Sequence, residues 1–110
     1  MGLMALVLAI GLLSATPIFA QSFVAFQSGD ELFDVCNVRE NDQRHLFCVG
    51  YIAGASDALN SQGTICTPKD VTVHQTVDVI LDYLRKHPEQ RHIAAPVLTS
   101  EAHGMAFSCK

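Results

Sequence analysis

Four cysteines are the side chains of this 110-residue chain with the most chemistry to offer: Cys36, Cys48, Cys66 and Cys109. Thiols can ligate a metal, attack a substrate or form crosslinks. A metal site built from all four is disfavoured, because no Cys-x-x-Cys spacing is present. An even number of cysteines behind an apolar leader is typical of disulfides. We therefore expect two disulfide bonds, no metal and no reactive thiol.

Five histidines could supply acid–base chemistry, namely His45, His74, His87, His92 and His103. Their spacing matches none of the usual catalytic patterns: there is no His-Glu-x-x-His pair, no Gly-x-Ser-x-Gly elbow and no glycine-rich phosphate loop. The closest approach to a site is His74 with Asp70 or Asp78, and both pairings are common on a solvated helix face. We expect no enzyme activity, no catalytic residue and no cofactor.

The first twenty residues resemble a secretory signal peptide. Residues 1–20 carry no charged side chain, hold an apolar stretch at 3–13 and end on Ala20, where a signal peptidase would cut before Gln21. An uncleaved membrane anchor is the weaker alternative, because about 11 apolar residues fall short of the roughly 20 that span a bilayer. We expect export, cleavage and one mature domain over residues 21–110, with no membrane contact after cleavage.

The charges of the mature chain are few and dispersed. The formal net charge is -4, from 11 acidic and 7 basic residues. No run of lysine or arginine could neutralise a phosphate backbone, so nucleic acid is not an expected partner. A domain of about 90 residues buries only about 60 to 65% of its unfolded surface, so crosslinks are expected to supplement its core.

Helix signals recur along the mature chain and predict an all-α fold, a small bundle of about four helices. Ser28 with Glu31 has the spacing of a capping box and begins a short first helix that reaches Cys36. A longer second helix is expected over residues 42–60, where no proline interrupts, and Ser61-Gln62-Gly63 ends it.

The third helix is the clearest prediction and the fourth is less regular. Thr72 with Gln75 repeats the capping-box spacing, and apolar residues then recur every three or four positions, which predicts a helix over about 73–87. In the fourth helix, residues 89–92 could form a first turn, while Pro96 should begin or kink the regular part. We expect its core face to comprise Val97, Leu98, Ala102, Met105 and Ala106.

The order of the helices favours one disulfide pairing, although four cysteines allow three. If the helices alternate in direction, Cys36 at the end of the first lies beside the first half of the second, which contains Cys48. Cys66 follows the far end of the second helix, and Cys109 at the end of the fourth returns to it. We favour Cys36 with Cys48 and Cys66 with Cys109, and the other two pairings stay open.

The second helix is rich in small residues. They form one stripe at three- and four-residue steps: Gly50, Ala53, Gly54, Asp57 and Ala58. Such a stripe lets another helix approach closely, within one chain or between two. We interpret Asp57 as a partly buried carboxylate with a hydrogen-bond partner, and Tyr51, beside the stripe, as a packing residue.

Several short motifs occur in order along the mature chain. They are Ser28-Gly29-Asp30-Glu31-Leu32 before Cys36, Cys48-x-Gly50-Tyr51-x-x-Gly54-x-x-Asp57, Ile65-Cys66-x-Pro68, Tyr83-Leu84 with His87-Pro88-Glu89, and Ala106-Phe107-x-Cys109. Each is weak alone, but their order and the four cysteine positions together resemble the Rap/Tai family of type VI secretion immunity proteins. Ser108 departs from the proline that the family pattern has before the last cysteine.

The resemblance implies a periplasmic, all-helical protein, often a homodimer, that binds a peptidoglycan amidase effector and occludes its catalytic cleft. Our leading candidate for the effector contact is the loop of residues 61–69, beside the crosslink at Cys66; the turn at 87–92 is second. The candidate contact residues are Ser61, Gln62, Gly63 and Lys69. The simpler alternative is that this loop only connects two helices.

A second hypothesis comes from a different class of function. Five histidines and eleven carboxylates would charge the chain as pH falls, as expected for a periplasmic stress or chaperone-like helical protein. A member of the family could also be an orphan with no cognate effector. An amidase or secretion-system gene next to this one would favour immunity.

Overall fold

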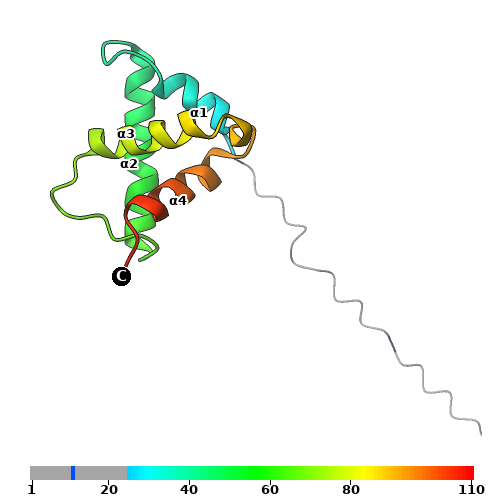
Figure 1. The fold of residues 1–110 in the computed structure, drawn as a ribbon, viewed down its shortest axis with the longest axis vertical. Coiled ribbons are helices and arrows are strands. Elements are labelled where there is room, and N and C mark those ends of the chain that lie inside the picture. Colours follow the sequence, from blue (N-terminus) through cyan, green and yellow to red (C-terminus); the bar gives the residue numbers. More distant parts are fainter. Residues whose placement is uncertain (1–10, 12–24) are drawn as a thin grey trace, which may run out of the picture.

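The computed structural model describes residue 11 and residues 25–110, and in this part of the chain helices follow one another without a strand (Figure 1). They are α1 (Gly29–Cys36), α2 (Gln43–Ser61), α3 (Val73–Lys86), the 3-10 helix η2 (Pro88–Gln90) and α4 (Ala95–Ala106). The prediction of an all-α fold with four main helices is confirmed. The expected signal peptide and its cleavage site lie outside the described residues, apart from position 11. None of the described helices has the length and hydropathy of a membrane span.

The predicted capping residues begin the helices. At α1 the Ser28 hydroxyl accepts a hydrogen bond from the Glu31 amide (3.2 Å), and the Glu31 carboxylate accepts one from the Ser28 amide (2.8 Å). Thr72 and Gln75 form the same reciprocal pair at α3, at 3.2 and 2.8 Å. Each box satisfies amides that a helix start would leave unpaired. Both capping boxes are thus confirmed.

Helices α2 and α3 each pack against the other three main helices. Figure 1 shows α1, α3 and α4 crossing α2. The contacts bury one cluster of apolar side chains: Leu32, Cys36, Cys48, Ile52, Val77, Ile80, Leu84, Ala95, Leu98 and Ala102. Every main helix contributes to this core, and the core therefore joins all four of them.

Both disulfides have the favoured pairing. Cys36–Cys48 joins the end of α1 to α2, with Cα atoms 5.0 Å apart, and both residues are buried in the core. Cys66–Cys109 joins the loop after α2 to the chain end, with Cα atoms 4.9 Å apart, and both of its residues are exposed. One crosslink therefore lies inside the core, and the other holds two surface segments together.

The start of α1 is docked on the segment that precedes α4. The amides of Gly29 and Asp30 donate to the carbonyls of Ile93 (2.8 Å) and Arg91 (2.7 Å), and the Ala95 amide donates to the Gln27 carbonyl (2.9 Å). The Arg91 guanidinium lies 3.9 Å from the centre of the Phe33 ring, a cation–π contact. These contacts fix where α4 begins relative to α1.

Two expectations about the fourth helix are wrong. Residues 89–92 do not begin it: η2 stands apart, and α4 starts at Ala95 with Pro96 in its first turn, where a missing amide costs little. Met105 is 74% exposed and Ala106 is also exposed, so neither faces the core. The docked start of α4 instead turns Thr99 and His103 inward beside Leu98 and Ala102.

We predict opposite effects for two glycine substitutions. A Cβ at Gly29 would collide with Leu98 Cδ1 and lie 2.7 Å from the Arg91 carbonyl oxygen, whereas a Cβ at Gly54 meets nothing within 4 Å. In the monomer, Gly29→Ala should lower the free energy of unfolding by about 2 kcal/mol, and Gly54→Ala should raise it by about 0.5 to 1 kcal/mol. Urea unfolding of the two variants checks this, and equal effects would contradict the tight docking of α1.

Candidate functional site

The candidate contact loop leaves α2 through a defined turn. The Gly63 amide donates to the Asn60 carbonyl (3.1 Å) and the Thr64 amide to the Leu59 carbonyl (3.0 Å). Gly63 has a φ of 71°, the left-handed conformation that glycine adopts without strain. Together these features form a Schellman motif, which ends the helix and sets the direction of the loop.

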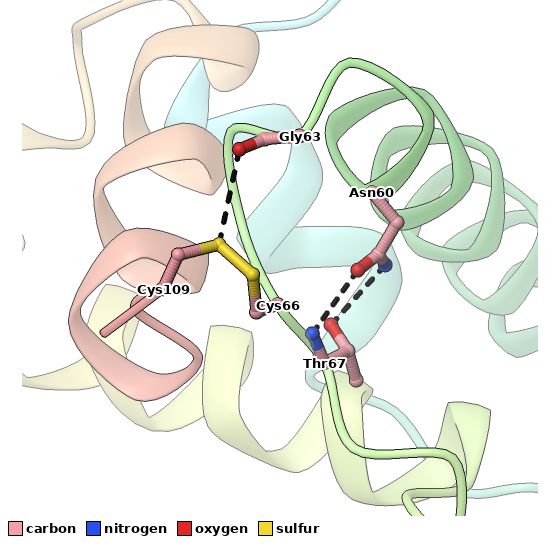
Figure 2. Close-up of a disulfide and its surroundings, with 5 residues drawn as sticks. All are labelled: Asn60, Gly63, Cys66, Thr67 and Cys109. Atoms are coloured by element: carbon pink, nitrogen blue, oxygen red, sulfur yellow. Dashed lines mark hydrogen bonds between the residues drawn. A yellow bond between two sulfur atoms is a disulfide. The ribbon is translucent and has the colours of Figure 1, made fainter.

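Three anchors hold the loop after this turn, and Figure 2 shows two of them, the Cys66–Cys109 disulfide and the Asn60–Thr67 hydrogen bonds. Ile65 is 2% exposed. The Cys66 amide donates to the Phe107 carbonyl (2.8 Å) beside the Cys66–Cys109 disulfide. The Asn60 side chain accepts from the Thr67 amide and donates to the Thr67 hydroxyl, both at 3.1 Å. The loop therefore has a fixed path without regular secondary structure.

All four candidate contact residues are exposed along this segment. Ser61 is in the last turn of α2, Gln62 and Gly63 form the turn, and Lys69 lies in a second turn ahead of α3. They expose amide, hydroxyl and ammonium groups along the segment but no nucleophile paired with a base. This arrangement can bind another macromolecule and offers no evident reaction chemistry.

The small-residue stripe is open to solvent in the described chain. Gly50 and Gly54 are exposed, and no atom lies within 4 Å of a Cβ built on either. A groove of about 480 Å³ lies beside Gly50, Gly54 and Ala58 of the stripe, with Pro96 and Thr99 on the α4 side. Tyr51, half-buried at its edge, packs against the core as expected, and burial raises the pKa of its hydroxyl.

The interpretation of Asp57 as a partly buried carboxylate is wrong. Asp57 is exposed and lies on the rim of a second, smaller hollow, between α2 and the loop. The stripe winds around α2, so Asp57 points toward the α3 side while the glycines point toward the α4 groove.

The most buried titratable group is one that the spacing of histidines did not single out. His103 has no exposed surface, and its Nδ1 lies 2.5 Å from the Thr99 carbonyl oxygen. A carbonyl can only accept, so Nδ1 carries a proton. The Ser56 hydroxyl lies 2.6 Å from Nε2 and 2.7 Å from the Ile52 carbonyl oxygen, and it can donate its single proton to only one of them. Burial lowers the pKa of His103 and thereby favours the neutral ring. The four-residue spacing of Thr99 and His103 predicts their hydrogen bond only once both residues are known to lie in α4.

His74 is stacked against His45 rather than paired with Asp70 or Asp78. The two rings are 6.0 Å apart at their centres and 3° from parallel. Both ring nitrogens of His45 are buried without a hydrogen-bond partner among the described residues. Within that same part of the chain, no three His, Cys, Asp or Glu side chains are placed to hold a metal ion.

Comparison with known families places the whole helical domain in one of them. A family model described as Rap1a immunity proteins matches residues 28–109, from the capping residue of α1 to the last cysteine. The chain belongs to the Rap1a family of immunity proteins. No individual curated protein matches it. Membership in the Rap1a family indicates an immunity protein that binds a secreted effector, which agrees with a site built for contact.

We expect the two disulfides of this Rap1a family member to be reduced in sequence. Cys66 and Cys109 are exposed, whereas Cys36 and Cys48 are 3% and 0% exposed. A reductant therefore reaches the Cys66–Cys109 disulfide without unfolding of the protein. Mild reduction followed by alkylation and peptide mass spectrometry should label Cys66 and Cys109 first, while circular dichroism still reports a folded chain. Parallel labelling of all four cysteines would contradict this order.

The buried imidazole of His103 should make stability depend on pH. Its pKa is below that of the unfolded chain, about 6.5, so the unfolded state binds more protons as pH falls below that value. The stabilisation is present above pH ~6.5 and is lost as pH falls toward the folded pKa, at up to about 1.4 kcal/mol per pH unit. Urea unfolding between pH 8 and 5 measures this slope.

Two variants isolate the contribution of His103. His103→Gln should flatten the slope between pH 7 and 5, whereas His92→Gln, at an exposed position, should retain it. An unchanged slope in His103→Gln would assign the dependence to other groups.

Proposed function

We propose that this chain is a periplasmic immunity protein that binds a type VI secretion peptidoglycan amidase and occludes its active-site cleft. Residues 1–20 act as the signal peptide and residues 21–110 form the mature domain. Membership in the Rap1a family supports the immunity role. The two disulfides support export, because such bonds persist in oxidising compartments such as the periplasm.

The observation that carries the proposal is the anchored loop after α2. A rigid inhibitor binds more tightly than a flexible one, since less conformational entropy is lost on binding. Residues 62–72 form a connection longer than the about 4 to 6 residues that usually join two elements. The Asn60 clamp holds the loop in addition to the turn that ends α2 and to the crosslink, which also supplements the small core. Their combination favours a binding role over that of a connection alone.

Occlusion requires no chemistry from the immunity protein itself. A loop seated in the cleft of a cysteine-histidine hydrolase keeps peptidoglycan out, and the fixed path of this loop also opposes its cleavage, because a protease site needs an adaptable, extended backbone. The open face of α2 fits the expected homodimer, since its exposed glycines and the neighbouring groove would admit a helix of a second copy.

The first experiment is a capture of periplasmic and secreted amidases on the oxidised mature chain, residues 21–110. Each captured amidase is then tested in a peptidoglycan-hydrolysis assay with and without the immunity protein. Tight binding that abolishes hydrolysis supports the proposal, and sedimentation of the complex counts the copies of each chain. A folded sample that binds no amidase would overturn it and favour an orphan or stress role.

Substitutions in the loop should weaken the captured complex. We expect Gln62→Ala combined with Lys69→Ala to raise the Kd at least tenfold, about 1.4 kcal/mol, because both side chains are exposed on the proposed contact surface. The matched control, Asn41→Ala with Arg85→Ala, alters exposed side chains away from the loop and should leave the Kd unchanged. Isothermal titration calorimetry checks both; full affinity in the loop variant would place the contact elsewhere.

A further inference from the structure

The hollow beneath Asp57, here the Asp57 hollow, is a feature that the anchored loop alone does not explain. It has a volume of about 260 Å³ and lies between the second half of α2, the loop and the start of α3. Its lining includes Asp57 and Asn60 of α2, Thr67, Pro68 and Val71 of the loop, and Val73 of α3. Figure 2 shows Asn60 and Thr67 of this lining facing each other across the space between α2 and the loop.

The neutral polar groups of the Asp57 hollow are already hydrogen-bonded to the protein. The Asn60 amide nitrogen donates to the Ser56 carbonyl (2.9 Å) and to the Thr67 hydroxyl, and its oxygen accepts from the Thr67 amide. The Ser56 hydroxyl contacts the Ile52 carbonyl (2.7 Å) and His103. These bonds fix the shape of the hollow, and they leave the Asp57 carboxylate as its one charged group.

Asp57 has no positive partner among the described residues. All seven lysines and arginines lie at or after Arg39, within the described residues. Two of them form ion pairs with other aspartates, Arg44 with Asp42 at 2.9 Å and Lys86 with Asp82 at 2.8 Å. No ion pair reaches Asp57 in the described part of the chain, so its carboxylate can accept hydrogen bonds from outside.

We propose that the Asp57 hollow receives a basic side chain, arginine above all, from the bound effector. The aliphatic stem of such a side chain would lie against Pro68, Val71 and Val73, and its head would pair with Asp57. An arginine suits the site because its planar head can bond both oxygens of one carboxylate. The net charge of -4 also attracts a basic surface. This inference rests on the proposed function, because it names the chemistry that the effector presents next to the contact loop.

The direct test needs no effector. The oxidised mature chain, isotope-labelled for NMR, is titrated with N-acetyl-arginine N-methylamide and, separately, with the neutral citrulline counterpart. We expect saturable shifts of the Asp57, Asn60 and Thr67 amides with the arginine probe alone. These shifts should disappear in Asp57→Asn and persist in Asp78→Asn, which changes an exposed aspartate of α3. Absent shifts, equal shifts with citrulline, or shifts retained in Asp57→Asn would overturn the inference.

An effector captured by the mature chain provides the second test. Asp57→Asn should weaken that complex about tenfold and reduce the dependence of its Kd on salt, because an ion pair is lost. Asp78→Asn should change neither quantity. An unaltered Kd and salt dependence in Asp57→Asn would overturn the basic-anchor inference while the immunity function stands. Failure of the chain to bind any amidase would instead remove the immunity function, and the probe titration would still decide what the hollow binds.

Discussion

A core too small to hold the chain by packing alone is the constraint on which the rest of this structure depends. The buried cluster contains ten residues, two of which are the cysteines of the inner crosslink. By the chain-entropy relation, loops closed over 12 and 43 residues stabilise a fold by about 3 and 4 kcal/mol. Those values are comparable to the whole net stability of a small domain. The crosslinks thus allow a long, exposed loop that the core could not otherwise hold in place.

The two disulfides stabilise different parts of the molecule, one in the core and one at the surface. Cys36–Cys48 fixes α1 on α2, and with the docking of Gly29 on the Arg91–Ile93 segment it sets the position of three helices. Cys66–Cys109 adds nothing to the buried cluster, because both residues are exposed. Besides stabilising the fold by closing a long loop, it joins the segment after α2 to the C-terminal segment, in the region that the proposed function uses.

Local signals in the sequence were sufficient for most of the fold. The capping boxes at Ser28 and Thr72 set the starts of two helices through bonds between neighbours, and helix order alone favoured the disulfide pairing. The register of α4 could not be predicted, because it depends on hydrogen bonds between the segment before it and the distant start of α1. The exposure of Asp57 and the burial of His103 follow from that register and from the path of the loop, so both were missed.

The glycines of α2 lower the stability of the helix, and no contact within the described chain offsets this loss. Each glycine inside a helix destabilises it by roughly 1 kcal/mol relative to alanine. At Gly50 and Gly54 no described segment packs closely enough to need the missing side chain, because nothing lies within 4 Å of a Cβ placed there. The close approach of a second chain that we propose would give them a physical use. The groove beside Gly54 and the hollow beside Asp57 flank the same half of α2, and the anchored loop begins at its end.

His103 connects these two surfaces from inside the core. Its ring bonds Ser56, which lines the Asp57 hollow, and Thr99, which lines the groove. Protonation of the ring would turn Nε2 into a donor to the Ser56 oxygen and would leave the Ser56 proton to the Ile52 carbonyl. Burial opposes that protonation by lowering the pKa of His103. The buried imidazole therefore links both walls through Ser56 and Thr99, and this helps to preorganise the second half of α2 for the proposed partner.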